Sequence, residues 1–490
     1  MSDAQYTQEG QAISYNNLTC QQLIELFSTC LGPDGTLKAL VSGNEEINLT
    51  KDGISLCKEV KFTHPTSIVI TRSANSLYET TGDGIITYIL IVCHTFTASY
   101  EKFCDGSKIP QIVNSLQLAV NDVSNFLKEK LIPLDDKNLR KLVESSLRTK
   151  IKNGYFLAEI LIKALSHTAD LKLIEIMKME GGDLSDSQFI PGLVLDHAGR
   201  SESMPEDLSN VCILITNMSM EYEKPEVSAE FAYNSIQQRE KLAEAEKEFI
   251  GERARKIAQL AAELRKENKS LLVISEKGID LFSLDVLSKA GVLALRRAKR
   301  RNLERLIKMC GGTIVTQLSQ VNKDSLGFCK KVTVKKVGEN KWTFIEGVPL
   351  KGASTILVRG NVDYSRASKS IKGTLMAVQA AAKSKCCIRG GKHLYKQLIE
   401  MLRAKKVHEA DSVGYEIIAR VFENILKTFF RNANENVQEK MVQLFRDGET
   451  EEVIDNAVVV GNCVTNAIYT TINLLMCDEM ILAGKPMSKQ

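Results

Sequence analysis

The sequence lacks the cysteine spacing of a metal site. Its 490 residues include 12 cysteines, but no two of them form a C-x-x-C pair, and the adjacent Cys386 and Cys387 do not change this. The six histidines stand far apart and form no cluster. Scattered cysteines are typical of small buried residues in a reducing compartment. We therefore expect neither a disulfide framework nor a zinc site.

Long apolar runs and an excess of charge of one sign are also missing. The most lipid-like runs, residues 85–93 and 474–476 with their neighbours, are far shorter than the ~20 residues that cross a bilayer. Residues 1–11 are polar and show no signal-peptide pattern. The formal net charge is only +4, which is too small to indicate a dedicated nucleic-acid-binding protein. We expect a cytoplasmic protein that binds neither membrane nor nucleic acid.

Proline is scarce, and the rest of the composition is ordinary. The chain has 9 prolines, with 44% hydrophobic and 25% charged residues. This composition is typical of a folded globular protein and argues against disorder or a fibrous rod. At roughly 150 residues per domain, the length suggests about three domains.

Apolar residues recur at helical spacing near both ends of the chain. One stripe covers residues 17–31, and its opening Asn-Leu-Thr predicts a helix start at Asn17. Another stripe covers residues 112–131, and the spacing returns from about residue 393. The middle differs, because residues 211–216 and Ser270–Ser275 are short β-rich runs followed by helical patterns. This nesting predicts that the two ends build one helical domain and that the middle forms an α/β insertion.

Residues 235–267 are dense in Ala, Glu, Lys and Arg and almost free of β-branched residues, which predicts a long helix. Two interpretations are open: a solvated helix on a domain surface, or a projecting helix whose exposed apolar stripe contacts a partner. Gly251, near the middle, would be a natural weak point. The apolar stripe is thin and consists of Leu242, Phe249, Ile250, Ile257, Leu260 and Leu264.

Three short turns combine glycine with aspartate: LGPDG at residues 31–35, LTKDG at 49–53 and TGDG at 81–84. A Gly-Asp-Gly turn that opens a helix directs free N–H groups at an anion, and its carboxylate can hold Mg²⁺ beside phosphate oxygens. Each turn alone is a weak indication, because Asp-Gly is also a common turn dipeptide. No G-x-x-x-x-G-K-[ST] motif is present, so a P-loop NTPase is not supported.

In this order, the three turns resemble the group II chaperonin family. The pattern continues with SLRTK at 146–150, GLVLDH at 192–197, the block KGIDLFSLDVLSKAGVLALRRAKRRNLERL at 277–306, and NLLMCDEMILAG at 473–484. Within the family, these motifs are most similar to the zeta class of subunits of the eukaryotic cytosolic chaperonin (TRiC). The resemblance covers about residues 17–484.

The resemblance implies a multidomain α+β chaperonin fold. A mostly helical equatorial domain would comprise residues 1–140 and 392–490, a hinge domain residues 141–191 and 353–391, and an α/β apical domain residues 192–352, with a helical protrusion at 235–267. It also implies ATP or ADP and Mg²⁺ as ligands. The implied partners are other subunits of a hetero-oligomeric double ring, and the unfolded client proteins that this cytoplasmic ring encloses and folds.

The resemblance further assigns roles to single residues. Asp83 would bind Mg²⁺, Asp52 would help orient the attacking water, and Asp455 would lie near the ribose or the base. The other implied nucleotide contacts are Leu31, Gly32, Pro33, Lys51, Gly82, Gly84, Ile85, Ile86, Thr149, Lys150, Gly390 and Gly391.

The chain departs from the family pattern at several of these positions. Ile85 and Ile86 replace two threonines, whose hydrogen bonds to phosphate are each worth roughly 1.5–3 kcal/mol. Asp34 replaces a lysine, and the glycine-rich turn at 389–392 reads RGGK, which is bulkier and more basic than usual. Gly373 stands where the family has the aspartate that activates water, and loss of a general base costs roughly 10²–10⁴-fold in rate.

These departures lead to the hypothesis that the chain binds nucleotide weakly or does not turn it over, and serves the ring structurally. One alternative is a fully competent ATPase subunit, either because the family's aspartate aligns one residue away from Gly373 or because nearby Asp363 substitutes for the missing base. Another is a free-standing interaction protein that has left the ring.

A basic run, RRAKRR, occupies residues 296–301. Because leucines flank it at helical spacing, a solvated helical face is a better interpretation than a nucleic-acid or nuclear-import motif. In a chaperonin, the run would place positive charge on the apical domain. We therefore expect Arg296, Arg297, Lys299 and Arg300 to bind acidic client segments or acidic co-chaperones.

Overall fold

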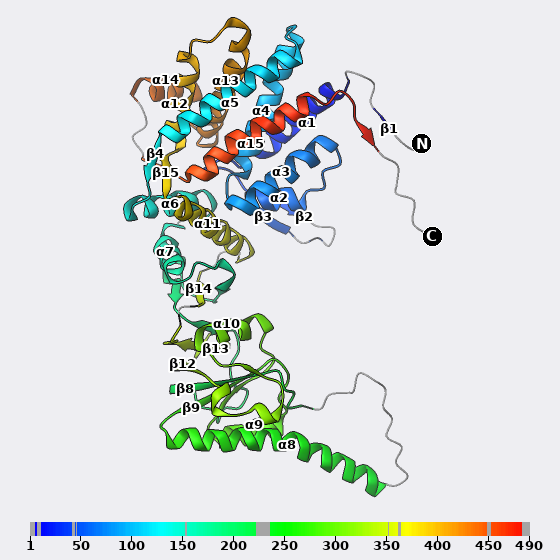
Figure 1. Ribbon diagram of the computed structural model, residues 1–490, viewed down its shortest axis with the longest axis vertical. Helices are drawn as coiled ribbons and strands as arrows, with labels where there is room; N and C mark the ends of the chain where they lie inside the picture. The colour runs from blue at the N-terminus through cyan, green and yellow to red at the C-terminus, as the bar shows by residue number, and fades with distance from the viewer. Residues whose placement is uncertain are drawn as a thin grey trace. The chain divides into compact units, whose positions relative to one another are not determined.

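The computed structural model divides the chain into two compact units (Figure 1). Unit 1 comprises residues 1–159 and 363–490, so both chain ends contribute to it, and unit 2 comprises residues 160–362. Each unit is described by itself. The residues that the structure describes are 5–6, 11–41, 45, 47–151, 154–221, 236–350, 352–360, 364–447 and 452–482.

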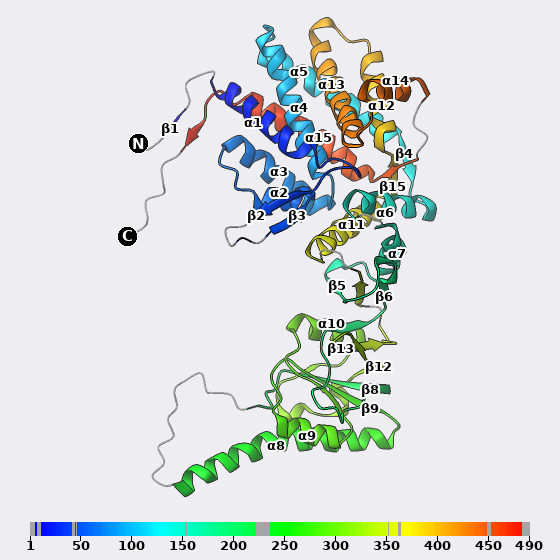
Figure 2. The ribbon, with the colours of Figure 1, turned by 180° about the vertical axis from the view of Figure 1, so that it is seen from behind.

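Unit 1 is built mainly from helices around the apolar helix α4 (Figures 1 and 2). Helix α4 contributes Tyr88, Ile89 and Phe96 to the core, and Phe27 of α1 and Phe422 of α13 lie in the same core. The helices are α1 (Gln11–Ser28), α2 (Gly53–Glu59), α3 (Pro65–Thr81), α4 (Ile85–Cys104), α5 (Ile109–Glu129), α6 (Asp136–Lys150), α11 (Tyr364–Ser384), α12 (Gly391–Ala404), α13 (Glu409–Asn432), α14 (Val437–Asp447) and α15 (Ala457–Leu475).

Small antiparallel sheets join distant segments of unit 1. Strand β15 (Cys386–Arg389) lies between β4 (Leu131–Pro133) and β16 (Ile454–Asp455). Strands β2 (Lys38–Val41) and β3 (Ile47–Thr50) form a hairpin, and β1 (Gln5–Tyr6) pairs with β17 (Ile481–Leu482). The register of β15 and β16 pairs Asp455 with Ile388. Since Ile388 lies two residues before Gly390, this register brings Asp455 close to the turn at Gly390 and Gly391.

Helix α15 is the one helix of the described chain that is long and apolar enough to cross a membrane. This criterion rests on length and composition alone, and half of its apolar window is buried inside the structure. Ala467, Ile468 and Ile472 of α15 belong to the core that α4 also lines. Helix α15 is therefore a core helix of unit 1.

Unit 2 contains two sheets. The larger sheet has the strand order β10-β9-β8-β12-β13-β7, with β11 added beside β8, and the smaller has the order β5-β14-β6. Helix α7 (Ala158–His167) leads into the unit. The elements are β5 (Ile174–Lys178), β6 (Gln188–Ile190), β7 (Leu193–Leu195), β8 (Asp207–Thr216), α8 (Ile236–Lys266), β9 (Ser270–Ser275), α9 (Leu281–Lys289), β10 (Leu293–Leu295), α10 (Arg300–Cys310), β11 (Ile314–Val315), β12 (Gly327–Val337), β13 (Asn340–Glu346) and β14 (Ser354–Val358).

The sequence predicts this nested α+β architecture correctly. Both β-rich runs are strands, and β8 and β9 lie parallel and adjacent in the larger sheet. The predicted helix start at Asn17 is wrong, because α1 begins at Gln11 and Asn17 is buried inside it. Parts of the expected hinge domain occur in both units: α6 and α11 in unit 1, and the β5-β14-β6 sheet in unit 2. The three-domain boundaries stay a prediction.

The long helix predicted at 235–267 is α8. Ile257 and Leu264 of its second half are buried in the core of unit 2, so this half is packed rather than projecting. The side chains of Leu242 and Phe249 lie outside the described residues, as does Ser235. The helix continues through Gly251, where the Phe282 ring approaches so closely that an added Cβ would lie 3.0 Å from it.

Candidate functional site

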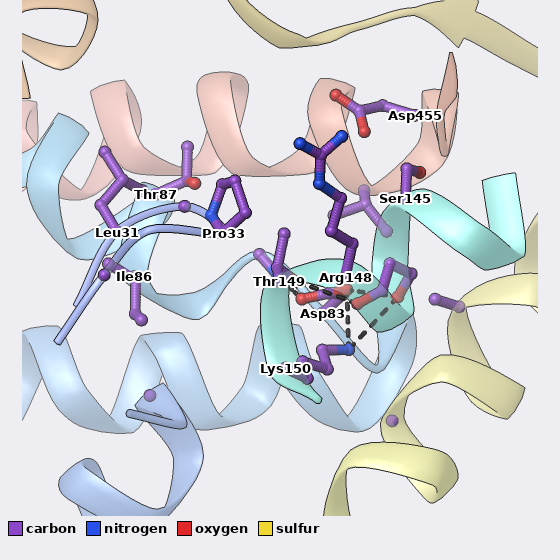
Figure 3. A pocket seen from close by; sticks show the side chains of 18 of the residues that line it. Leu31, Pro33, Asp83, Ile86, Thr87, Ser145, Arg148, Thr149, Lys150 and Asp455 are labelled. Atoms are coloured by element: carbon purple, nitrogen blue, oxygen red, sulfur yellow. Dashed lines mark hydrogen bonds and ion pairs between the residues drawn. The ribbon is translucent and has the colours of Figure 1, made fainter. Parts of the chain in front are cut away.

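A cavity of about 970 Å³ opens in unit 1 (Figure 3). Its walls come from the loop after α1, the starts of α2 and α4, the end of α6, and parts of α11, α12, α13 and α15. Gly390 is not among the lining residues but directly precedes Gly391, which is. The cavity brings together the predicted site residues Leu31, Gly32, Pro33, Lys51, Asp52, Gly82, Asp83, Gly84, Ile85, Ile86, Thr149, Lys150, Gly373, Gly391 and Asp455.

The loop after α1 is held in place by α13. Gly32 has a φ of 81°, and an added Cβ would lie 2.9 Å from the Phe429 ring, so glycine is required here both by conformation and by space. The side-chain amide of Asn432 donates hydrogen bonds to the carbonyl oxygens of Ser28 and Leu31, both at 2.9 Å. These contacts fix the backbone at the mouth of the cavity.

Asp83 lies in a turn between two left-handed glycines, immediately before α4. Gly82 has a φ of 74° and Gly84 a φ of 89°. Gly84 is the N-cap of α4, so the first N–H groups of this helix lack intrahelical acceptors and face the cavity end of the helix. This end of α4 can therefore stabilise an anion.

Both oxygens of the Asp83 carboxylate have partners within the protein. Oδ1 accepts a hydrogen bond from the Gly84 N–H at 2.9 Å, and Oδ2 accepts one from the Ser146 hydroxyl at 3.0 Å. The Lys150 ammonium lies 2.8 Å from Oδ2 (Figure 3). A carboxylate suits Mg²⁺ chemically, but as arranged here its cation partner is Lys150, so the residues do not leave Asp83 open to a metal.

Asp52 caps the start of α2 beside this pair. Its backbone N–H donates to the Thr50 hydroxyl at 3.0 Å, and the Ser55 hydroxyl donates to its Oδ2 at 3.2 Å. Burial raises the pKa of the Asp52 carboxyl, and the nearby Asp83 carboxylate adds to the rise, while Lys150 offsets part of it. Asp52 is therefore a buried carboxyl with a raised pKa that lies close to Asp83 and Lys150.

The lysine next to Asp52 holds the opposite loop. The Lys51 ammonium donates to the carbonyl oxygen of Pro33 at 3.0 Å. Burial lowers the pKa of Lys51, and the guanidinium of Arg366 lowers it further. Lys51 therefore links the two predicted turns at 31–35 and 49–53.

Gly373 faces the Asp83 turn from α11. An added Cβ would lie 2.8 Å from the carbonyl oxygen of Gly82, 3.0 Å from the Tyr78 hydroxyl and 3.5 Å from the Lys150 ammonium. The position where the resemblance implies a catalytic aspartate is therefore at the cavity wall, beside the other predicted acidic residues. A side chain there would require a shift, because the nearest atom is a backbone oxygen rather than the end of a flexible side chain.

Asp455 closes the other end of the cavity from β16. Its Oδ2 accepts a hydrogen bond from the Gly391 N–H at 3.0 Å, and the carboxylate lies so close to Gly390 that no Cβ fits there. Burial raises the pKa of the Asp455 carboxyl, and the Gly391 bond partly offsets this. Gly390 and Gly391 thus shape the backbone around Asp455.

Ile85 and Ile86, where the resemblance implies threonines, are apolar parts of the wall. Ile85 is buried against Gly53, where an added Cβ would lie 2.8 Å from it, and Ile86 lines the cavity at the start of α4 (Figure 3). The Thr149 hydroxyl donates to the carbonyl oxygen of Ser146 at 2.9 Å.

Several wall residues were not singled out from the sequence. Ser146 stands inside the SLRTK motif, which is a signal that could have identified it. Thr374 does not line the cavity itself, but its hydroxyl lies 3.2 Å from that of Ser146, and its local sequence carries no signal. The local sequence also gives no signal for the basic and aromatic residues of the wall. Among them, Arg148 extends between Pro33 and Asp455 (Figure 3). These residues are Arg148, Arg366, Lys369, Lys392, Tyr395 and Phe429.

The basic run lies in unit 2, and the structure corrects its predicted helical conformation. Residues 296–299 form the connection between β10 and α10, which begins at Arg300. Arg297 pairs with Glu221 at 3.4 Å and Arg300 with Glu276 at 3.2 Å. The Lys299 ammonium lies 3.8 Å from Asp196, and Arg296 donates to the carbonyl oxygen of Ile279 at 3.1 Å. The run is therefore engaged in contacts within the unit.

Taken together, the cavity can bind a polyanion. It combines the N-terminus of α4 with basic side chains from α6, α11 and α12, and it has an apolar aromatic wall at Tyr395 and Phe429. In the part of the chain that the structure describes, no group of three or more His, Cys, Asp or Glu side chains is arranged to hold a metal ion.

Comparison with known proteins agrees with this architecture. The profile of the TCP-1/cpn60 chaperonin family matches residues 23–485. Human T-complex protein 1 subunit zeta-2 is 32% identical, in an alignment that covers 99% of this chain and 98% of the human protein. The chain is a member of the TCP-1/cpn60 chaperonin family, and its α+β architecture is the chaperonin fold.

Proposed function

We propose that this chain is a subunit of a hetero-oligomeric double-ring chaperonin in the cytoplasm, which uses ATP to enclose and fold unfolded proteins. Family membership supports this proposal, as does the similarity to a human protein whose name describes a subunit. Acidic client segments or co-chaperones at the basic run remain part of the proposal. They would have to compete with the ion pairs that already engage Arg297 and Arg300.

We further propose that the cavity of unit 1 binds ATP or ADP and that this chain turns ATP over slowly or not at all. The N-terminus of α4 and the basic wall residues would hold the phosphates, and the aromatic wall would accept the base. The resemblance assigns Mg²⁺ to Asp83, but the Lys150 ammonium already pairs with that carboxylate, so the proposal gives the metal no role here. The observation that carries the proposal is Gly373, which brings no carboxylate to the wall beside the Asp83 turn.

Asp52 does not replace the missing base in this proposal. Asp52 is the N-cap residue of α2, and its carboxylate accepts the Ser55 hydroxyl. The resemblance assigns it the orientation of the attacking water rather than the removal of a proton. Asp363, the other alternative, lies outside the described residues. A glycine at 373 has no group that accepts a proton, so the proton of an attacking water would have no dedicated acceptor at that wall.

The test restores the lost groups in the full-length chain. The variant carries Gly373→Asp with Ile85→Thr and Ile86→Thr, and the matched control carries Gly373→Asn with the same two threonines. Both side chains crowd the Gly82 carbonyl equally, and only the aspartate can accept a proton. We expect the aspartate variant to hydrolyse ATP about 10²-fold faster or more than the asparagine control. Equal rates in the two variants would refute the assignment of Gly373.

Ring membership has a separate test. Native mass measurement or electron microscopy of the protein purified from its own cells should give a double ring with other subunits. A monomer of 54.4 kDa as the sole species would favour the free-standing alternative.

A further inference from the structure

The Asp83 carboxylate already has a cation. The Lys150 ammonium lies 2.8 Å from Oδ2, the Ser146 hydroxyl donates to the same oxygen at 3.0 Å, and the Gly84 N–H occupies Oδ1 at 2.9 Å. A metal ion that used this carboxylate would have to displace the ammonium from Oδ2. The two cations therefore compete for one oxygen.

Lys150 has little freedom to leave. Its side chain is only 12% exposed, and an ammonium removed from water needs a partner of opposite charge. The carboxylates that face it are Asp83 and Asp52, and the Asp52 carboxylate already accepts the Ser55 hydroxyl. Release of Asp83 to a metal would leave the ammonium with a weaker partner.

Gly373 makes this competition a property of this chain. An added Cβ at 373 would lie 3.5 Å from the Lys150 ammonium, so an aspartate there, whose carboxylate oxygens lie two bonds beyond Cβ, could reach ion-pair distance. That carboxylate would draw the ammonium away from Asp83 and leave Oδ2 to a metal. With glycine at 373, no such partner is supplied by α11, and Lys150 stays on Asp83.

We propose that Lys150 acts as a built-in counter-cation of Asp83, so that this chain binds its nucleotide with little dependence on Mg²⁺. The inference rests on the proposed function, because it presumes that the cavity binds ATP or ADP. The phosphate charge is then met by the basic side chains of the wall, of which Lys51, Arg148, Arg366 and Lys392 line the cavity. The absence of a carboxylate at 373 thus lowers the dependence of nucleotide binding on Mg²⁺ and also lowers the rate of ATP hydrolysis.

Equilibrium binding of a fluorescent ATP analogue to the full-length chain tests this, measured with MgCl₂ and with EDTA. We expect the dissociation constant of the natural chain to change less than about threefold on chelation, and that of Gly373→Asp to rise about tenfold or more, where tenfold corresponds to about 1.4 kcal/mol. Gly373→Asn carries the same crowding against Gly82 without the charge, and we expect it to behave like the natural chain.

A second variant keeps the proposal testable if residue 373 tolerates no side chain. Lys150→Gln removes the ammonium and leaves the Gly82–Gly373 contact intact, so chelation should now weaken binding about tenfold or more. A natural chain that itself loses tenfold on chelation would overturn the inference, as would a Lys150→Gln variant as indifferent to Mg²⁺ as the natural chain. Absence of nucleotide binding in both buffers would instead contradict the proposed function.

Discussion

Gly82 packs so closely against Gly373 of α11 that no Cβ fits between them, and this contact yields a quantitative prediction. An added Cβ at Gly82 would lie 2.5 Å from the Gly373 carbonyl oxygen and 2.5 Å from the Cβ of Met376. The neighbour on one side is the backbone of α11, which cannot rotate away as a flexible side chain would. Gly82 also has a φ of 74°, which L-residues with a side chain rarely adopt.

The substitution Gly82→Ala should therefore destabilise unit 1 by two effects. The left-handed backbone costs about 1–2 kcal/mol for a residue with a Cβ, and overpacking against α11 costs about 1–3 kcal/mol more. We expect a loss of about 2–5 kcal/mol in the free energy of unfolding. Gly106→Ala is the matched control, because Gly106 has a φ of 101° and nothing within 4 Å of an added Cβ. It should lose only the backbone part.

Denaturant unfolding followed by circular dichroism measures the loss, and hydrogen exchange in α11 shows where it falls. Trp342, the only tryptophan of the chain, is buried in unit 2, so its fluorescence reports on the unit that the substitution leaves untouched. Equal losses for Gly82→Ala and Gly106→Ala, or unchanged exchange in α11, would refute the reasoning from the close contact.

Three further predictions concern single side chains. His94 has a pKa lowered to about 4 by burial and by a nearby arginine. The unfolded chain therefore binds the extra proton first, and about 3 kcal/mol of stability should be lost as the pH falls from about 6.5 to about 4. Glu175→Gln should cost about 3–5 kcal/mol because it leaves the buried Arg305 guanidinium unpaired, as measured by tryptophan fluorescence during unfolding. Gly390→Ala should weaken ATP binding about tenfold, or 1.4 kcal/mol, because its Cβ displaces the Asp455 carboxylate.

Each of these has a control in the same chain. His94→Gln should flatten the acid limb of the stability curve, and an unchanged limb would contradict the role of His94. Glu144→Gln breaks an exposed pair with Arg140 and should cost less than about 1 kcal/mol. Gly461→Ala adds a Cβ that meets nothing within 4 Å, so it should leave ATP binding unaltered. Equal losses of stability in Glu144→Gln and Glu175→Gln would refute the role of the Glu175–Arg305 pair. Equal losses of ATP binding in Gly461→Ala and Gly390→Ala would refute the contact between Gly390 and Asp455.

The architecture was predictable where local periodicity carried the signal. The β-rich runs at 211–216 and Ser270–Ser275 became neighbouring parallel strands, and the helical stripes at both ends became one helical unit. The start of α1 was not predictable in this way. The sequence predicts a helix start at Asn17, but Asn17 is buried inside α1, as is its neighbour Asn16, which accepts a hydrogen bond from the Thr66 hydroxyl. A tertiary contact from α3 thus overrode the local preference of asparagine for helix ends.

The cavity was predictable only in part. The glycine and aspartate turns marked the Asp83 side of it, because close backbone approach needs glycine at fixed positions. Arg366 and Phe429 come from elements more than 270 residues away from those turns in the chain, and nothing in their local sequence distinguishes them from other helix residues. The pairing of Lys150 with Asp83 was likewise invisible, since charge pairing between distant segments depends on the fold.

The central claim is that this chain holds ATP without a base to activate water. The most direct measurement is the state of bound nucleotide over time: the purified full-length chain is loaded with radiolabelled ATP, and the ratio of bound ATP to ADP is followed through many minutes. The account predicts that ATP persists in the natural chain and is converted to ADP when aspartate and threonines are restored at 373, 85 and 86. Conversion to ADP in the natural chain, as fast as in the restored variant, would contradict it.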